Sequence, residues 1–256
     1  MRVLLDGSAG VAGVPAADPG LPELAQLYAV PPGLSGAGRW LRANMVTTLD
    51  GAAFGADSRS GSINTPADRV VFELIRALSD AVIVGAGTVR AEGYSPLRVA
   101  PEYAALRASV GRRPPLPLVV VSNSGRLPEG LAQQSSTAPV LAVVPSRCRR
   151  LAQLRDVLGQ DAVIVAGADE VDLVVALAAV ADRGWPHLLT EGGPRLLGRL
   201  LQAGLVDELD LTIAPSVTAG EASRVVTGPA LAPPSGFRLL TLLEQDHTVL
   251  GRWLRD

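Results

Sequence analysis

Short apolar runs alternate with stretches of helical periodicity along most of the chain. Val71, Leu74, Ile75 and Leu78 recur at the spacing of one buried helix face, which predicts a helix over 65–79. Further helices are expected over residues 21–27, 148–158, 171–182 and 196–201. Runs too short for a helix predict buried strands over residues 40–48, 81–84, 118–121, 140–144, 162–165 and 187–189.

The C-terminal part has a different pattern. Residues 208–213 alternate as a half-solvated strand does, and residues 237–243 and 248–254 predict a closing antiparallel pair. Strands that alternate with helices form mainly parallel sheets with helices on both faces. We therefore expect an α/β fold with a mostly parallel central sheet flanked by helices and a C-terminal antiparallel pair.

The chain of 256 residues fits one large α/β domain or two small ones. Residues 1–38 are rich in Gly, Ala and Pro, which predicts an N-terminal arm in front of a single domain over residues 39–256. Residues 98–116 hold several Arg and Pro and are expected to form a surface excursion.

Two glycine turns each join a predicted strand to a predicted helix. The first, Thr190 to Pro194, presents bare backbone N–H groups and a positive helix end, which is an arrangement that binds anions. Its alternative is a turn whose glycines only let a helix pack closely on a strand. The second turn, Gly85 to Thr88, lacks the third glycine of the dinucleotide fingerprint. Glu191 would repel a phosphate at the first turn unless its side chain faces a second ligand.

Ligands of open parallel sheets bind beyond the carboxyl ends of the strands. Both glycine turns, the polar turn at 122–126 and the turn at Asp50-Gly51 follow predicted strands. The sequence therefore predicts one cleft with several backbone anion sites and few catalytic side chains. This suits an enzyme whose nucleotide cofactor carries the chemistry, and it suits equally a nucleotide-binding protein without chemistry.

Composition excludes several classes of protein. All 23 basic residues are Arg, so a phosphate-loop lysine and a Schiff-base lysine are absent. One Cys and two His without zinc-site spacing predict no metal centre. A net charge of −2 argues against a nucleic-acid partner, and no apolar run is long enough for a membrane span or a signal peptide. A cytoplasmic protein is expected.

Three residues near the predicted cleft have two interpretations each. Asp68, three residues after Thr65, caps a helix or faces a substrate ring as a carboxylate. Arg76 is a solvated helix residue or a clamp for a phosphate or carboxylate. Thr88 is an N-cap or contacts a phosphate at a helix start.

Several segments, taken in order, resemble the pyrimidine reductase of riboflavin biosynthesis, a member of the dihydrofolate-reductase-like superfamily. They span about residues 40 to 254, and their order and spacing make the resemblance specific. The family's zinc deaminase domain has no counterpart here, so a stand-alone reductase is expected. The matching segments are Thr48-Leu49-Asp50-Gly51, Ser60 to Pro66, Gly87 to Glu92, Ser122-Asn123 with Arg126, Glu191 to Pro194, and Leu205 to Leu209 with Ile213-Ala214-Pro215.

The resemblance implies a dihydrofolate-reductase-like fold, an NADPH cofactor and a homodimer. It implies hydride transfer to a 5-amino-6-(5-phosphoribosylamino)uracil-type substrate. We expect Asp68, from its interpretation as a substrate-facing carboxylate, and Glu191 to be the catalytic residues. Cofactor contacts would fall on Val46, Ser62, Thr88, Glu92, Asn123 near the 2′-phosphate, Gly192, Gly193, Pro194, Arg195, Leu196 and Leu197. Substrate contacts implied by the resemblance would fall on Ser60, Arg76, Arg98 and Glu191, and the interpretation of Asp68 as a substrate-facing carboxylate adds that residue.

Departures from the family pattern cluster on the substrate side. Asn44 stands where the family usually has Lys, Gly61 and Ser62 where it has Glu and Trp, and Glu92-Gly93 where it has an acidic pair. Cofactor binding therefore transfers better than substrate identity. A dihydrofolate-reductase-type pterin reductase and a non-catalytic NADPH-binding protein remain as alternatives.

Overall fold

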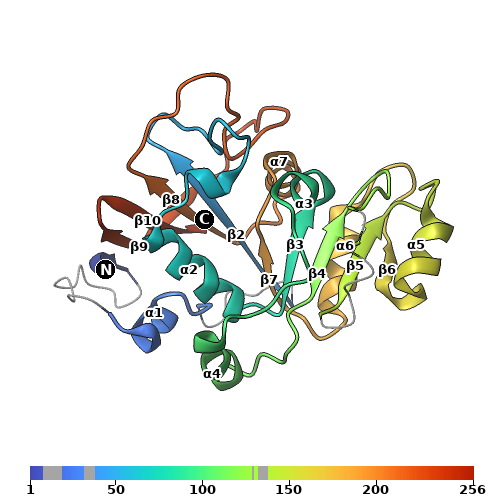
Figure 1. Cartoon of the computed structure of the whole chain (residues 1–256), viewed down its shortest axis with the longest axis horizontal. Helices are drawn as coiled ribbons and strands as arrows, with labels where there is room; N and C mark the ends of the chain where they lie inside the picture. The colour runs from blue at the N-terminus through green and yellow to red at the C-terminus, as the bar shows by residue number, and fades with distance from the viewer. Residues whose placement is uncertain (8–18, 32–37, 129, 132–137) are drawn as a thin grey trace.

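A ten-stranded sheet runs through the molecule in this computed structural model, which describes residues 1–7, 19–31, 38–128, 130–131 and 138–256 (Figure 1). The strand order is β1-β9-β10-β8-β2-β7-β3-β4-β5-β6. The strands are β1 (Arg2–Asp6), β2 (Trp40–Thr48), β3 (Ala81–Gly85), β4 (Leu118–Val121), β5 (Val140–Val144), β6 (Val163–Val165), β7 (His187–Thr190), β8 (Glu208–Ala214), β9 (Phe237–Gln245) and β10 (Thr248–Arg255).

The sheet has a parallel part and an antiparallel part. Strands β8, β2, β7, β3, β4, β5 and β6 are parallel to one another, whereas β10 runs antiparallel to β8 and β9, and β9 antiparallel to β1. The carboxyl ends of the parallel strands therefore meet at one edge. The fold class predicted from the sequence is confirmed.

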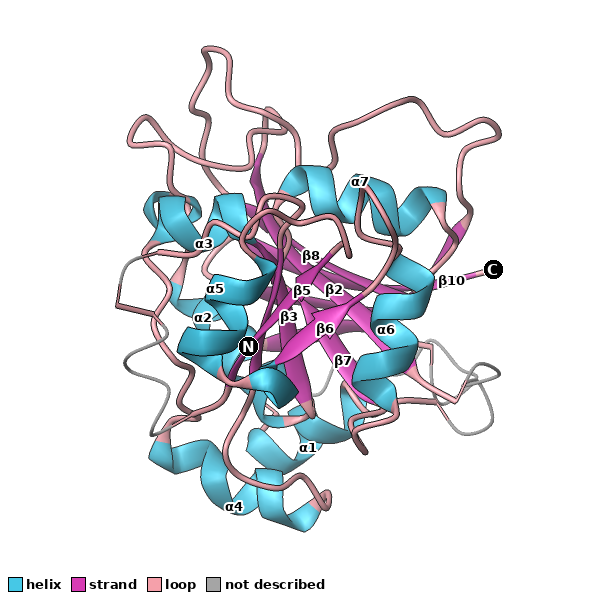
Figure 2. Ribbon diagram, turned by 90° about the vertical axis from the view of Figure 1, so that its right-hand side faces the viewer, coloured by secondary structure: helices cyan, strands magenta, loops and turns pink. Residues whose placement is uncertain are grey.

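Helices cover both faces of the sheet (Figure 2). The cluster that contains Leu74, Val84 and Val120 packs helices of one face, and the cluster that contains Ile83, Val119 and Leu197 packs helices of the other. On the first face lie α1 (Leu21–Leu27), α2 (Pro66–Ala77), α3 (Ala86–Glu92), α4 (Pro101–Ser109) and α5 (Leu151–Leu158), and on the second lie α6 (Leu173–Ala181) and α7 (Pro194–Gln202). None of the described helices is long and apolar enough to cross a membrane.

Three segments differ from what their sequence indicated: residues 98–116, residues 1–38 and strand β8. The expected surface excursion contains α4, whose Tyr103 and Arg107 are buried, because Arg107 donates to the carbonyls that end α2. The described parts of residues 1–38 include the predicted helix α1 and an unpredicted strand, β1, paired with β9; residues 8–18 and 32–37 lie outside the described chain.

Strand β8 alternates as predicted, but its polar residues are the buried ones, whereas a half-solvated strand was expected. Glu208, Asp210 and Thr212 face the interior, while Leu209 and Leu211 are half-buried. Glu208 Oε1 accepts hydrogen bonds of 2.7 Å from the Nε atoms of both Arg42 and Arg252. The same arginines donate to backbone carbonyls of Leu27, Tyr28 and Ala29, so this ionic cluster fixes the end of α1 onto the sheet.

Candidate active site

The two glycine turns meet at the carboxyl edge of the sheet. The Gly85 N–H donates to Gly192 O across 2.9 Å, which joins the start of α3 to the start of α7. A Cβ on residue 193 would lie 2.2 Å from Thr88 Oγ1, so only glycine allows this approach. Gly192 has a φ of +85°, a conformation that glycine adopts without strain. The N-cap of α3 is Gly85. Thr88 is the third residue of this helix, so its interpretation as an N-cap is wrong.

These two helix starts leave backbone N–H groups available to an anion. At Gly87 no atom lies within 4 Å of the position of a Cβ, so the start of α3 borders open space. Gly193 is the N-cap of α7, and Pro194 stands at the beginning of that helix, as its sequence predicted. The side chains of Leu196 and Leu197 are buried in the core, and therefore only their backbone can contact a ligand here. The side chain of Arg195 is exposed.

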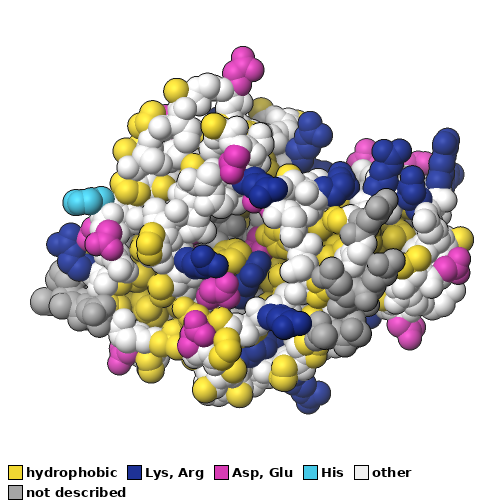
Figure 3. Space-filling model, in the orientation of Figure 1, with side chains coloured by type: hydrophobic (Ala, Val, Ile, Leu, Met, Phe, Trp, Pro, Cys, Tyr) yellow, Lys and Arg dark blue, Asp and Glu magenta, His cyan; other side chains and the backbone are white. Residues whose placement is uncertain are grey.

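A cavity of about 1000 Å³ opens next to these turns. Strand β2, helix α2, the segment after α3 and Glu191 form its walls, and Figure 3 shows charged side chains of both signs around the hollow in this face. Seven of the residues predicted for cofactor or substrate line it: Val46, Ser60, Asp68, Arg76, Glu92, Arg98 and Glu191.

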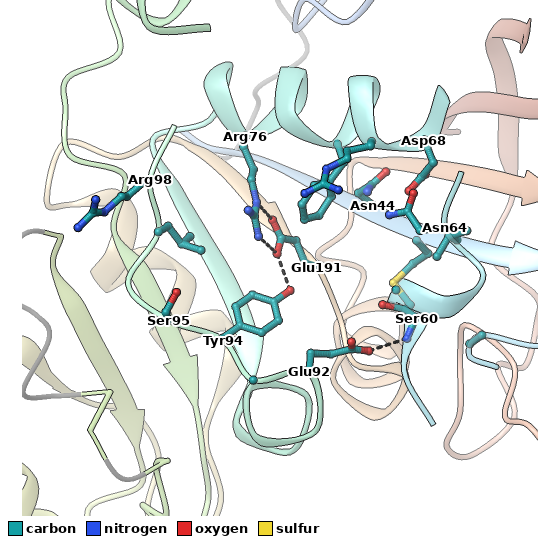
Figure 4. A pocket seen from close by; sticks show the side chains of 18 of the residues that line it. Asn44, Ser60, Asn64, Asp68, Arg76, Glu92, Tyr94, Ser95, Arg98 and Glu191 are labelled. Carbon is teal, nitrogen blue, oxygen red and sulfur yellow. Dashed lines mark hydrogen bonds and ion pairs between the residues drawn. The ribbon is translucent and has the colours of Figure 1, made fainter. Parts of the chain in front are cut away.

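Glu191 forms part of the cavity wall and is bound by two partners (Figure 4). Arg76 donates from Nε to Oε1 across 2.6 Å and from Nη2 to Oε2 across 2.8 Å. The Tyr94 hydroxyl donates to the same Oε2 across 2.6 Å. Both carboxylate oxygens are therefore engaged by side chains of α2 and of the segment after α3. Burial alone would lower the pKa of Arg76, but the charge of the adjacent Glu191 raises it by more. The pKa therefore lies above its usual value, and the guanidinium stays charged.

Asp68 stands at the other end of the cavity, beside Asn44 and Asn64 (Figure 4). Its backbone N–H donates to Thr65 Oγ1 across 3.2 Å, so Thr65 caps α2 and fixes the position of Asp68. The side chain is only 2% exposed, and its Oδ1 has no hydrogen-bond partner among the described residues. Burial raises the pKa of Asp68 to about 6, although a hydrogen bond with the Thr212 side chain opposes the rise.

The loop over the cavity is attached to α3. Glu92 Oε1 accepts a hydrogen bond of 2.8 Å from the Ser60 backbone N–H, which brings a predicted cofactor residue and a predicted substrate residue together. Ser62 is not among the residues that line this cavity, and its hydroxyl donates to Asp57 Oδ1 across 2.7 Å. Arg98 borders the cavity, with its guanidinium directed away from Glu191 in Figure 4.

A second cavity of about 620 Å³ lies beyond β4 and β5 at the same edge. Asn123 lines it, and its Oδ1 accepts a hydrogen bond of 2.9 Å from the Val171 N–H. Basic side chains gather over this region of the molecule, near α5, in Figure 3. Four of the lining residues are arginines, and none is a carboxylate: Arg126, Arg147, Arg149 and Arg150.

Sequence reasoning assigned no binding role to several polar residues of the first cavity, among them Asn44, Asn64, Arg69 and Tyr94. Tyr94 follows Gly93 with no motif to mark it, and Arg69 lies on α2, seven residues before Arg76, without an assigned role. Asn44 was noticed as a departure from the family pattern, which was the available signal. Asn64 lies in the matching Ser60 to Pro66 segment but carried no assigned role.

Residues 39–250 match the family described as the RibD C-terminal domain. The chain belongs to this family. A relative from Archaeoglobus fulgidus is named 2,5-diamino-6-ribosylamino-4(3H)-pyrimidinone 5′-phosphate reductase. It is 30% identical over 183 residues, which cover 72% of this chain and 83% of the relative. The resemblance predicted from the sequence motifs is confirmed.

Solved structures agree with this family. A pyrimidine reductase-like protein from Corynebacterium diphtheriae is 25% identical, with a TM-score of 0.78 and coverage of 91% of this chain and 98% of that chain. Dihydrofolate reductase from Enterococcus faecalis, 13% identical, has a TM-score of 0.50 over 85% of this chain and 96% of that chain, which shows a shared fold alone. The predicted dihydrofolate-reductase-like fold is confirmed.

Proposed function

We propose that this protein is an NADPH-dependent reductase of a ribosylaminopyrimidine 5′-phosphate. The observation that carries the proposal is the position of the charged cavity, directly beside the meeting point of two glycine turns, in a member of the RibD C-terminal domain family. Backbone N–H groups there suit a pyrophosphate, and side chains of the cavity suit a polar heterocycle.

The cofactor assignment rests on the chemistry of the carboxyl edge. Thr88, Gly192, Gly193 and the backbone from Pro194 to Leu197 would hold the pyrophosphate, with Val46 and Glu92 nearer the nicotinamide. The arginines around the second cavity would hold the 2′-phosphate that distinguishes NADPH from NADH, because guanidinium groups match phosphate geometry. Ser62 would need its loop to turn before it could contact the cofactor.

The bound nicotinamide would supply a hydride to the carbon of a carbon–nitrogen double bond, and a proton from water would reach the nitrogen. Asp68 would hold the ring, because its buried Oδ1 has no partner among the described residues and would accept hydrogen bonds from ring N–H donors. Glu191, held rigid by Arg76 and Tyr94, would orient the ring from the opposite side. Arg69 and Arg98 at the rim, with Ser60, would attract the substrate phosphate.

The hydrogen bonds of Arg76 to Glu191 argue against its role as a direct phosphate clamp. Two of its nitrogen atoms are hydrogen-bonded to Glu191, and its guanidinium stacks 4.0 Å from the centre of the Phe72 ring. Its contribution to binding is therefore proposed to act through Glu191.

A pterin reductase is a second candidate, because the unpartnered oxygen of Asp68 also suits the donor groups of a pterin. Turnover by the purified protein, followed by loss of the reduced nicotinamide absorbance, separates the candidates. We expect oxidation of NADPH with a ribosylaminopyrimidine 5′-phosphate and none with dihydrofolate. Tight NADPH binding without turnover of either compound would favour a non-catalytic binding protein.

We also propose that the protein forms a homodimer and acts in the cytoplasm. Leu239, Trp253 and Leu209 are register neighbours across β9, β10 and β8, and they leave a partly exposed apolar row on one sheet face. Such a row suits a second copy of the chain. Light scattering should give about twice the chain mass of 26.5 kDa, and Trp253→Arg should lower it toward that of one chain.

A further inference from the structure

The carboxylates that line the main cavity are Asp68, Glu92 and Glu191, and they differ in what their oxygens already bind. Both oxygens of Glu191 accept hydrogen bonds from Arg76 or Tyr94. Glu92 Oε1 accepts the Ser60 N–H. Both groups have hydrogen-bond donors in place before any substrate enters, and neither has a buried oxygen without a partner among the described residues.

Asp68 is the exception. The Thr212 hydroxyl is the side-chain hydrogen-bond partner that lowers its pKa, and no cation contributes to that pKa. Its Oδ1 is buried with no partner in the described chain. An unpaired buried acceptor costs about 1–3 kcal/mol, so this oxygen favours a ligand that brings a donor. The neighbouring amides of Asn44 and Asn64 offer hydrogen-bond groups on either side (Figure 4).

Two pyrimidine classes present different edges to such a group. A 2-aminopyrimidin-4(3H)-one has neighbouring N–H donors at ring N3 and at the 2-amino group. In a uracil, a carbonyl oxygen replaces that amino group, so the same edge sets an acceptor against the carboxylate. A carboxylate accepts several hydrogen bonds and donates none, and it therefore pairs with the first edge and repels the second.

We infer that Asp68 is the specificity-determining residue that selects a 2-amino-4-oxopyrimidine over a uracil as the reducible substrate. The inference rests on the proposed function and narrows its substrate class, away from the uracil type that the family resemblance implied. Glu191 is not the selector, because its two oxygens already serve Arg76 and Tyr94. The substrate would come from a reaction that leaves the 2-amino group in place, ahead of any hydrolytic deamination.

The experiment compares the 2,5-diamino-6-ribosylaminopyrimidinone 5′-phosphate with its uracil counterpart. Binding of each compound is measured by calorimetry, and kcat/KM with NADPH is measured for each. The wild-type protein should favour the 2-amino compound by at least about tenfold, since a single mismatched buried hydrogen bond commonly costs that much or more.

The Asp68→Asn variant should lose or reverse this preference. A carboxamide offers one acceptor and one donor, which match the N3–H and C2 carbonyl of uracil. Asp156→Asn, the same change at an exposed position of α5, should leave the ratio unchanged. Glu191→Gln should weaken the binding of both compounds to a similar extent.

A wild-type preference for uracil, or a preference that Asp68→Asn leaves intact, would overturn the inference. The wild-type ratio decides this even if the variant fails to fold. If NADPH is not oxidised with either pyrimidine, the proposed function fails, while the binding ratio still decides the role of Asp68. If neither compound binds, both the proposed function and the role inferred for Asp68 are contradicted.

Discussion

Two carboxylates in one cavity differ through their surroundings. Glu191 faces a guanidinium and a phenol, whereas Asp68 has a hydroxyl partner and a buried, unpaired oxygen. The first arrangement favours a fixed charge. The second holds a group that can bind donors and change protonation near neutral pH, which is why Asp68 is the better candidate for substrate chemistry.

The raised pKa of Asp68 predicts a pH-dependent effect on stability. Burial raises it from 3.8 to about 6, so the stability given by the neutral form is fully present below pH 3.8 and is lost as the pH rises through about 6. Asp68→Asn keeps the side chain neutral. At pH 8 the variant should exceed the wild type in free energy of unfolding by about 2–3 kcal/mol, a difference that should vanish toward pH 4. Urea denaturation across this range measures it, and a difference independent of pH would contradict the explanation.

The position of Asp68 could be predicted from the sequence, but its surroundings could not. The spacing of Thr65 and Asp68 correctly indicated a helix start, and that start faces the cavity. Tyr94 was missed because it reaches Glu191 from a segment 97 residues away in the chain. Contacts of that range depend on how strands are ordered in the sheet, and local periodicity does not encode this order.

At the scale of elements, β8 shows that alternation gives a period but not a direction. The polar positions Glu208 and Asp210 point inward, because Arg42 on β2 and Arg252 on β10 lie on the same face and compensate Glu208. Burial and the charge of Glu208 raise the pKa of Asp210 well above its usual value, which favours its neutral form. A half-solvated strand was the sequence interpretation; the sequence of β8 alone does not reveal cations on neighbouring strands.

Removal of the shared acceptor tests this cluster. Glu208→Gln leaves two buried guanidinium groups with their main negative partner gone, and it should lower the free energy of unfolding by about 3–5 kcal/mol. Asp169→Asn is the matched control, because Asp169 and Arg147 form an ion pair with both side chains 72% exposed. That change should cost less than about 1 kcal/mol. Equal losses in the two variants, measured by urea denaturation, would show that burial of the pair has no special effect.

At the scale of the whole molecule, two cavities share one edge of the sheet. The strands with their glycine and polar turns were predicted from the sequence, and with them the meeting of these turns at the carboxyl edge. The second cavity was foreseen only through Asn123 and Arg126. Its other arginines come from the segment that leads into α5, whose approach to β4 depends on the packing of β5 between them.

The arginines of the second cavity lead to a prediction of how the protein distinguishes NADPH from NADH. Arg150→Gln and Arg126→Gln should each raise the KM for NADPH about tenfold, equivalent to about 1.4 kcal/mol, because each removes a cation from the proposed site of the 2′-phosphate. The KM for NADH, which lacks that phosphate, should stay within about twofold under the same arithmetic. Arg238→Gln on β9, an exposed cation at the opposite end of the sheet, should alter neither value. Steady-state kinetics with both cofactors at one salt concentration measure the effect, which should weaken as ionic strength rises. A parallel rise in the KM for NADH would instead indicate a loss of structure around the adenosine, and the second cavity would then have no part in selecting NADPH.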